Sequence, residues 1–180
     1  MASRLRLFSV PVGLGLVTIA GVVVLDQITK WWVIEVVMQP PRVIPVTFFL
    51  NLVMGWNKGV SFGLLNQDSP YNAWVLSALA LAITVGLLIW LARVRRRGLA
   101  LAIGLVVGGA LGNVIDRLRF GAVADFLDFH AFGLHWPAFN VADTGISIGA
   151  AIIVLDSLFG GWETPKNKGG PGSAGADPKA

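Results

Sequence analysis

The sequence predicts an α-helical integral membrane protein with four transmembrane helices and a small β-sheet on the periplasmic side, in the first outer loop. Of its 180 residues, 55% are hydrophobic, and the mean hydropathy is +0.72. A soluble domain of this length could not bury that much apolar surface. Four apolar stretches are each long enough to cross roughly 30 Å of hydrocarbon as a helix. They span approximately residues 7–32, 72–92, 98–117 and 140–159.

The distribution of basic residues predicts the orientation of these spans. Nine of the 14 basic residues precede the first span, lie between the second and third spans, or follow the fourth span. The positive-inside rule therefore places both termini in the cytoplasm and the other two loops outside. Residues 1–160 are predicted to form one domain. Residues 161–180 are rich in Gly, Pro and Lys and predict a disordered cytoplasmic tail.

The two outer loops differ in composition. The first contains a predicted β region at approximately 43–65, because residues 46–54 are rich in β-branched and aromatic side chains and glycines follow them. The second, about 118–139, is interpreted as a short polar loop. The chain has no cysteine, so it forms no disulfide and carries no cysteine-linked lipid of its own.

Three glycines in the third span, Gly104, Gly108 and Gly112, are spaced four residues apart. They form a flat ridge on one helical face, against which another helix can pack closely. Packing within the molecule is favoured over a dimer interface.

Polar residues gather near the outer ends of the spans. Ionisable groups in a membrane span are costly and are therefore functional candidates. Four separate segments bring such residues to one depth, which predicts a functional site at the outer membrane surface. The candidates are Asp26 and Lys30 in the first span, Asn113 and Arg117 in the third, Asp125 in the second outer loop, and Asn140 and Asp143 at the start of the fourth.

Several of these residues also have purely structural interpretations. Asp26 and Lys30, four residues apart, fit an ion pair at a helix end, and the sequence allows either Lys30 or Arg117 as the partner of Asp26. Asn140 and Asp143 fit an N-cap with an acid at the third helical position. Arg117 could bind a lipid phosphate.

Asp125 and Asp143 are the pair that these interpretations explain least well together. Two carboxylates at close range cannot both ionise easily, so they share a proton. The ionised group can then accept a proton from water while the protonated group donates one to a carbonyl oxygen or a leaving amine. This chemistry hydrolyses a peptide without a covalent intermediate. Two other acids, Asp116 and Asp156, are expected to pair or to lie at an interface without a special role.

Two other kinds of site are weaker. Ser61 lies in G-V-S-F-G, a match to the G-x-S-x-G nucleophile pattern, but nothing orients either histidine as its base. His130 and His135 with Asp125 and Asp128 could in principle bind zinc, yet no H-E-x-x-H or paired-cysteine spacing supports a metal site. We therefore expect neither a serine nucleophile nor a metal.

Four motifs occur in the order typical of one family. The sequence resembles the signal peptidase II (lipoprotein signal peptidase) family of bacterial inner membranes. The matching segments are DQITK at 26–30, NKGVSFG at 57–63, GGALGNVIDRLRFGAVADFLDF at 108–129 and PAFNVADTGISIG at 137–149.

The resemblance implies an aspartyl endopeptidase that removes the signal peptide from diacylglyceryl-modified prolipoproteins by cutting before the lipidated cysteine. It implies Asp125 and Asp143 as the catalytic pair, no cofactor, inhibition by cyclic peptides of the globomycin type, and no need for a hydroxyl at Ser61. The residues it implies as supporting the site or binding substrate are Asp26, Lys30, Asn57, Asn113, Arg117 and Asn140.

Two other functions fit the sequence less well. A proton-coupled membrane transporter could use the outer cluster of Asp, Asn and Arg, but it would need ionisable groups along a path through the bilayer. The middles of the second and third spans carry no charge. A non-enzymatic scaffold would not need the aspartate pair at all.

Overall fold

The computed structural model describes residues 10–59 and 71–159. In this part of the chain, four helices are long and apolar enough to cross a membrane, as predicted. Ser61 and the predicted tail lie outside the described residues. The helices are α1 (Val10–Trp32), which continues as the π-helical turn η1 (Val33–Val37), α2 (Asn72–Leu91), α3 (Arg97–Phe120) and α4 (Val141–Phe159).

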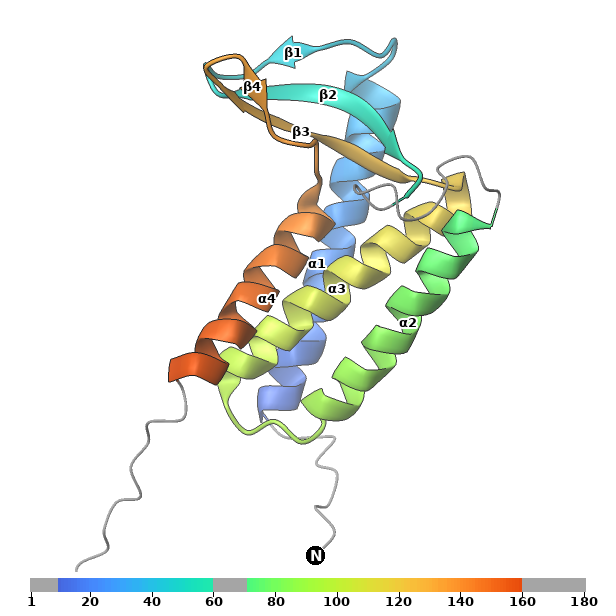
Figure 1. The fold of residues 1–180 in the computed structure, drawn as a ribbon. Coiled ribbons are helices and arrows are strands. Elements are labelled where there is room, and N and C mark those ends of the chain that lie inside the picture. Colours follow the sequence, from blue (N-terminus) through green and yellow to red (C-terminus); the bar gives the residue numbers. More distant parts are fainter. Residues whose placement is uncertain (1–9, 60–70, 160–180) are drawn as a thin grey trace, which may run out of the picture.

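Helix α3 is the centre of the bundle, and α1, α2 and α4 all pack against it (Figure 1). Its glycines allow the close approach of α1. A Cβ at Gly104 would lie 2.7 Å from the carbonyl oxygen of Gly15, and one at Gly108 would lie 2.7 Å from the Cβ of Val22. The predicted role of this ridge in packing within the molecule is therefore confirmed.

A four-stranded antiparallel sheet covers one end of the bundle (Figure 1). The prediction that the sheet belongs to the first outer loop was incomplete, because the second outer loop contributes half of the strands. Apolar residues outnumber polar ones between Val123 and Ala131, and this segment pairs with β2 from Leu50 to Asn57. The strands, in spatial order, are β1 (Ile44–Pro45), β2 (Leu50–Asn57), β3 (Val123–Ala131) and β4 (Leu134–His135).

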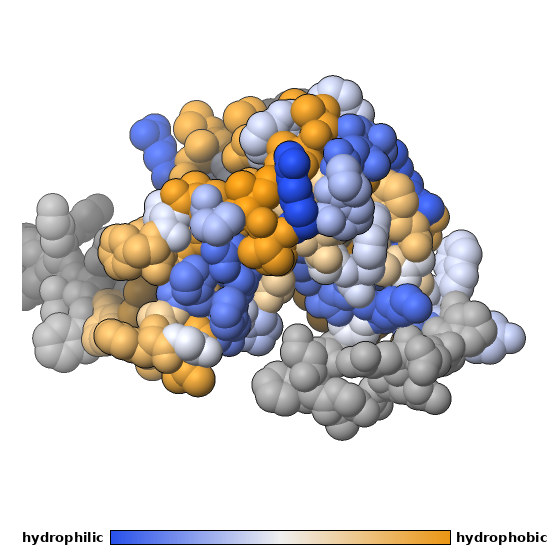
Figure 2. All heavy atoms as spheres, turned by 90° about the horizontal axis from the view of Figure 1, so that it is seen from above, coloured by the Kyte–Doolittle hydropathy of each residue, from blue (hydrophilic) through white to orange (hydrophobic). Residues whose placement is uncertain are grey.

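The sheet is joined to the end of the first helix by a small apolar core. Val33, Met38 and Phe126 are buried together there. Seen from above, this end of the molecule shows hydrophilic and apolar side chains interleaved (Figure 2). Residues of β1, β2 and β3 therefore pack against the end of the first helix, and other parts of the sheet present mixed surfaces.

At the opposite end, Arg96 pairs with Asp156 at 2.8 Å. Arg96 is exposed, so this ion pair contributes at most about 1 kcal/mol. The expectation that Asp156 has no special role agrees with this surface contact.

Candidate active site

Two carboxylates from different elements face one cavity. Asp125 is the third residue of β3, and Asp143 is the third residue of α4. Both line a cavity of about 550 Å³. The remaining lining residues are Asn57, Thr144, Ser147, Ile148 and the segment 136–139. The cavity therefore runs from the sheet down one side of α4.

The position of Asp143 follows from the way α4 begins. Asn140 precedes the helix, and its side-chain oxygen accepts a hydrogen bond from the Asp143 backbone N–H at 2.9 Å. The Asp143 carboxylate in turn accepts from the Asn140 backbone N–H at 3.3 Å. This reciprocal arrangement is a capping box, so the N-cap predicted for this pair is confirmed. The capping role and a functional role are compatible, because the carboxylate also faces the cavity.

Three asparagines present their amide NH₂ groups to the two carboxylates. Asn57 and Asn140 donate to the two oxygens of Asp125 at 3.1 and 2.7 Å, and Asn113 donates to Asp143 at 2.8 Å. These neutral donors hold each carboxylate in one orientation without adding a positive charge.

Each of these amides is oriented by a second contact to its oxygen. The oxygen of Asn57 accepts from the Gly59 N–H at 3.1 Å, and that of Asn113 accepts from the Lys30 ammonium at 3.1 Å. The oxygen of Asn140 is occupied by the helix cap. Because an ammonium or a backbone N–H can only donate, the NH₂ group must point the other way, toward the carboxylate.

Below the two carboxylates lies a buried ion cluster. Lys30 bridges Asp26 at 2.9 Å and Asp116 at 2.8 Å, and all three side chains are at most 2% exposed. The partner of Asp26 is therefore Lys30. Gln27 also bridges the two acids, at 3.1 and 3.0 Å. Asp116 pairs as expected, but sequence reasoning missed its place in the cluster and missed Gln27. The signals available were an acid inside an apolar span and the polar neighbour of Asp26.

The same cluster holds the backbone of both segments that carry the cavity carboxylates. Asp26 accepts from the Ala142 N–H at 2.9 Å, one residue before Asp143. Asp116 accepts from the Ala124 N–H at 3.1 Å, one residue before Asp125. The cluster thus ties the start of α4 and the start of β3 to α1 and α3.

The electrostatics of the cavity favour a retained proton. Burial raises the pKa of the Asp125 carboxyl to about 6, and the neighbouring Asp143 carboxylate adds to the rise, while the bonds from Asn57 and Asn140 oppose it. Arg117 is half-buried near these acids. Among the described residues its Nε has no hydrogen-bond partner and no carboxylate lies within ion-pair distance. That Nε is itself buried, and Arg117 is not among the residues that line the cavity.

The histidines are not part of this constellation. His135 pairs with Asp128 at 2.9 Å, and His130 stacks on His135 at 5.2 Å. They lie toward the far end of β3 from Asp125. Within residues 10–59 and 71–159, no group of three His, Asp or Glu side chains is arranged to hold a metal ion.

Comparisons with known proteins agree with the motifs. The profile of the family described as "Signal peptidase (SPase) II" matches residues 18–159. The chain is 45% identical over 148 residues to the lipoprotein signal peptidase of Methylorubrum extorquens (strain PA1), covering 80% of this chain and 85% of the relative. It is 44% identical over 149 residues to that of Ralstonia nicotianae, covering 81% and 82%.

A solved structure shares the fold. This structure, described as a bacterial membrane enzyme solved by the in meso method at 2.3 Å, superimposes with a TM-score of 0.73. The two chains are 29% identical, and the match covers 89% of this chain and 96% of the other. The arrangement of four helices and an outer sheet is therefore found in an experimentally solved bacterial membrane enzyme.

Proposed function

We propose that this chain, which belongs to the signal peptidase II family, is an aspartyl endopeptidase with Asp125 and Asp143 as its catalytic pair. Membership of the family makes it a multi-pass bacterial membrane peptidase that removes the signal peptide from prolipoproteins. The observation that carries this proposal is that two carboxylates on different elements line one cavity. A transporter is not favoured, since the relatives are peptidases.

The pair activates water directly. The ionised carboxylate removes a proton from water as its oxygen attacks the scissile carbonyl carbon, and the protonated carboxyl donates its proton to the carbonyl oxygen. When the tetrahedral intermediate collapses, the carbon–nitrogen bond breaks and the leaving amine takes a proton from the pair. The raised pKa of Asp125 fits the proton-carrying role.

The surrounding residues hold this pair and bind the substrate. Asn57, Asn113 and Asn140 keep the carboxylates facing the cavity through their amide donors. Asp26 and Lys30 act through Asn113 and the backbone, as positioning residues. We assign Arg117, whose positive charge lies near Asp125 and Asp143, to binding a polar group of the substrate.

The location of the site suits a lipid-modified substrate. The cavity lies where the sheet meets the helix ends, and the positive-inside rule assigns this end to the periplasmic surface, with both termini cytoplasmic. A cysteine carrying diacylglycerol keeps its acyl chains in the outer leaflet. Its scissile bond then lies at headgroup depth, beside Asp125 and Asp143. Cyclic peptides of the globomycin type are expected to compete for the same cavity.

The deciding experiment measures signal-peptide release from a diacylglyceryl-modified prolipoprotein by the purified enzyme. Asp125→Asn and Asp143→Asn should each abolish release, because each removes one half of the proton exchange. Asp156→Asn, which alters a carboxylate at the other end of the bundle, and Ser61→Ala should both remain active. Normal cutting by either of the first two variants would refute the catalytic pair.

A further inference from the structure

The hairpin formed by β3 and β4 has two chemically different faces. His130 lies directly opposite His135, and Ala131 lies opposite Leu134. Because side chains alternate along a strand and opposite residues share a face, these two pairs point to opposite sides. The side that carries His130 and His135 is called the polar face, and the side that carries Ala131 and Leu134 is called the apolar face.

The polar face carries hydrogen-bonding groups, of which His135 is exposed while Asn51 and Asp128 are buried. His135 pairs with Asp128 and stacks on His130, and Asn51 donates to Asp128 at 3.0 Å. Hydrogen bonds from Asn51 and His135 lower the pKa of Asp128, so the Asp128 carboxylate stays ionised at neutral pH.

The apolar face carries side chains that the described protein leaves uncovered. Leu134 is 77% exposed and Trp136 is 70% exposed. The Trp136 N–H donates to the Phe129 carbonyl at 2.8 Å, which continues the pairing by one residue and places the two rings on the same side. Phe129 also stacks between Phe49 and Phe139, with ring centroids 5.8 and 5.5 Å away.

The tip of this hairpin is built around another exposed aromatic. Phe132 is fully exposed and has a φ of +53°, and Gly133 follows it with a φ of +79°. Hairpin turns of this shape normally use Asn, Asp or Gly at both positions. A bulky residue there costs stability, and the described residues do not bury the Phe132 ring in return.

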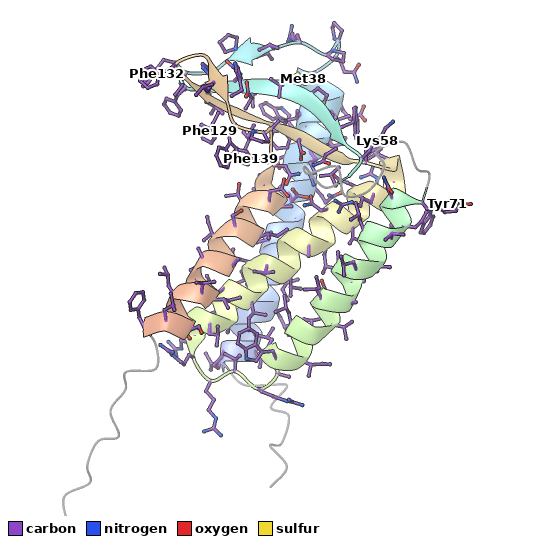
Figure 3. The ribbon with its side chains drawn as sticks, in the orientation of Figure 1. Met38, Lys58, Tyr71, Phe129, Phe132 and Phe139 are labelled. Atoms are coloured by element: carbon purple, nitrogen blue, oxygen red, sulfur yellow. The ribbon has the colours of Figure 1, made fainter. Side chains whose placement is uncertain are left out.

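The apolar face points toward the plane of the bilayer. Asp125 and Phe129 are four residues apart on β3, so they share a face, and Asp125 faces the cavity at the outer end of α4. Figure 3 shows Phe129 and Phe139 between the sheet and the helices, and Phe132 at the free end of the sheet.

We propose that the apolar face of the β3–β4 hairpin, with Phe132 at its tip, inserts into the interfacial region of the outer-side lipid leaflet. The occupant is lipid because this face is continuous with the membrane-spanning surface: Trp136 lies five residues before α4 begins and also lines the cavity. Indole and phenyl rings favour this interface. The contact holds the sheet, and with it Asp125, at a constant height above the membrane. This lipid contact does not depend on the assignment of Asp125 and Asp143 as the catalytic pair.

The absence of cysteine from the chain permits a direct test. Leu134→Cys and His135→Cys place a nitroxide spin label on adjacent residues of opposite faces. In nanodiscs holding one protein each, the label at position 134 should be more accessible to oxygen, which dissolves in lipid, than to a water-soluble nickel complex. The label at position 135 should show the reverse. Equal access of nickel to both labels would overturn the proposal, as would exclusion of both reagents from position 134, which would indicate a protein contact.

A second pair of variants tests the tip. Adding Phe132→Gly to the Leu134→Cys variant relaxes the backbone and removes the ring, so nickel access to the label should rise several-fold. Phe132→Trp retains an interfacial ring and should leave access low. If Phe132→Gly leaves nickel access unchanged, the ring does not hold the hairpin in the leaflet. Peptidase activity of the same variants in detergent reports separately whether each variant is still folded.

Discussion

At the scale of single residues, the distinctive choice is asparagine rather than a charged donor around the two carboxylates. A lysine or arginine in direct contact would favour ionisation of both acids and would lower their pKa values. An amide donates a hydrogen bond while remaining neutral, so one proton can stay on the pair. The second contact of each amide then removes the freedom to flip.

This arrangement predicts that Asn140→Asp abolishes cleavage although it preserves shape. The new carboxylate can still cap α4, but it cannot donate to Asp125, and it adds negative charge beside two acids. Release of the signal peptide should fall by at least about 100-fold, in line with the loss of a group that holds a catalytic residue. Asn51→Asp makes the same change at a second buried asparagine–aspartate contact, that with Asp128. It should retain activity, and equal loss in both variants would point to a folding defect instead.

The pKa of Asp125 predicts the pH dependence of cleavage. Since this pKa is raised to about 6, kcat/KM should decline as the pH rises through that value and the pair loses its proton. The hydrogen bond from Asn57 favours the ionised form and so lowers the pKa. Removing it in Asn57→Ala should therefore move the alkaline limb to higher pH, whatever happens to the maximal rate.

A pH profile of kcat/KM for the two proteins measures this shift. Asn51→Ala is the matched control, because it removes the corresponding bond to Asp128 and should leave the limb where it is. A limb that moves to lower pH in Asn57→Ala would contradict the assignment of the titrating group.

At the scale of elements, α3 determines how closely the other helices approach the site. Gly112 lies where α3 meets both the ion cluster and the start of α4. A Cβ there would lie 2.5 Å from the Asp26 carboxylate and 3.4 Å from the Ala142 Cβ. Asp26 cannot move away, because it is buried and holds Lys30 and the Ala142 N–H.

We therefore expect Gly112→Ala to destabilise the protein by about 1–3 kcal/mol, as overpacking does elsewhere, and to reduce cleavage strongly. Gly86→Ala in α2 adds the same methyl group where no atom lies within 4 Å, so it should be neutral or slightly stabilising. Thermal unfolding in detergent and the cleavage assay compare the two. Equal behaviour of both variants would show that close packing at Gly112 is not required.

At the scale of the whole molecule, the helix bundle and the sheet each contribute residues to the candidate active site. The bundle supplies Asp143 and the ion cluster, and the sheet supplies Asp125 and Asn57. The cavity therefore exists only while the sheet is held against the helix ends. The apolar core around Met38 holds one side of the sheet, and the proposed lipid contact of the hairpin holds the other.

The orientation in the membrane gives a prediction at the same scale. Val43 is exposed beside the sheet, and Ser157 is exposed near the other end of α4. In intact spheroplasts, a membrane-impermeant maleimide should label Val43→Cys and leave Ser157→Cys unlabelled until the membrane is opened. The reverse pattern would show that the cavity faces the cytoplasm and that the positive-inside assignment is wrong.

The sequence by itself determined the four spans, because the length of an apolar helix and the thickness of a bilayer are local and fixed quantities. It also predicted the cap of α4 by Asn140 and Asp143 and the close packing along Gly104 and Gly108, since both depend on residue spacing within one helix. The residue pattern singled out Asp125 and Asp143, and the motif resemblance implied the same pair. The comparisons do not test this choice beyond membership of the family.

Only the tertiary structure decided which polar groups meet across segments. The second outer loop became half of the sheet because its hydrogen bonds go to β2, more than 60 residues away in sequence. The placement of Gln27 and Asp116 around Lys30, and the link from that cluster to both Ala124 and Ala142, depend on how α1, α3 and α4 are rotated against each other. Hydrophobic periodicity defines that rotation poorly in a membrane, since the lipid-facing and protein-facing sides of a helix are both apolar.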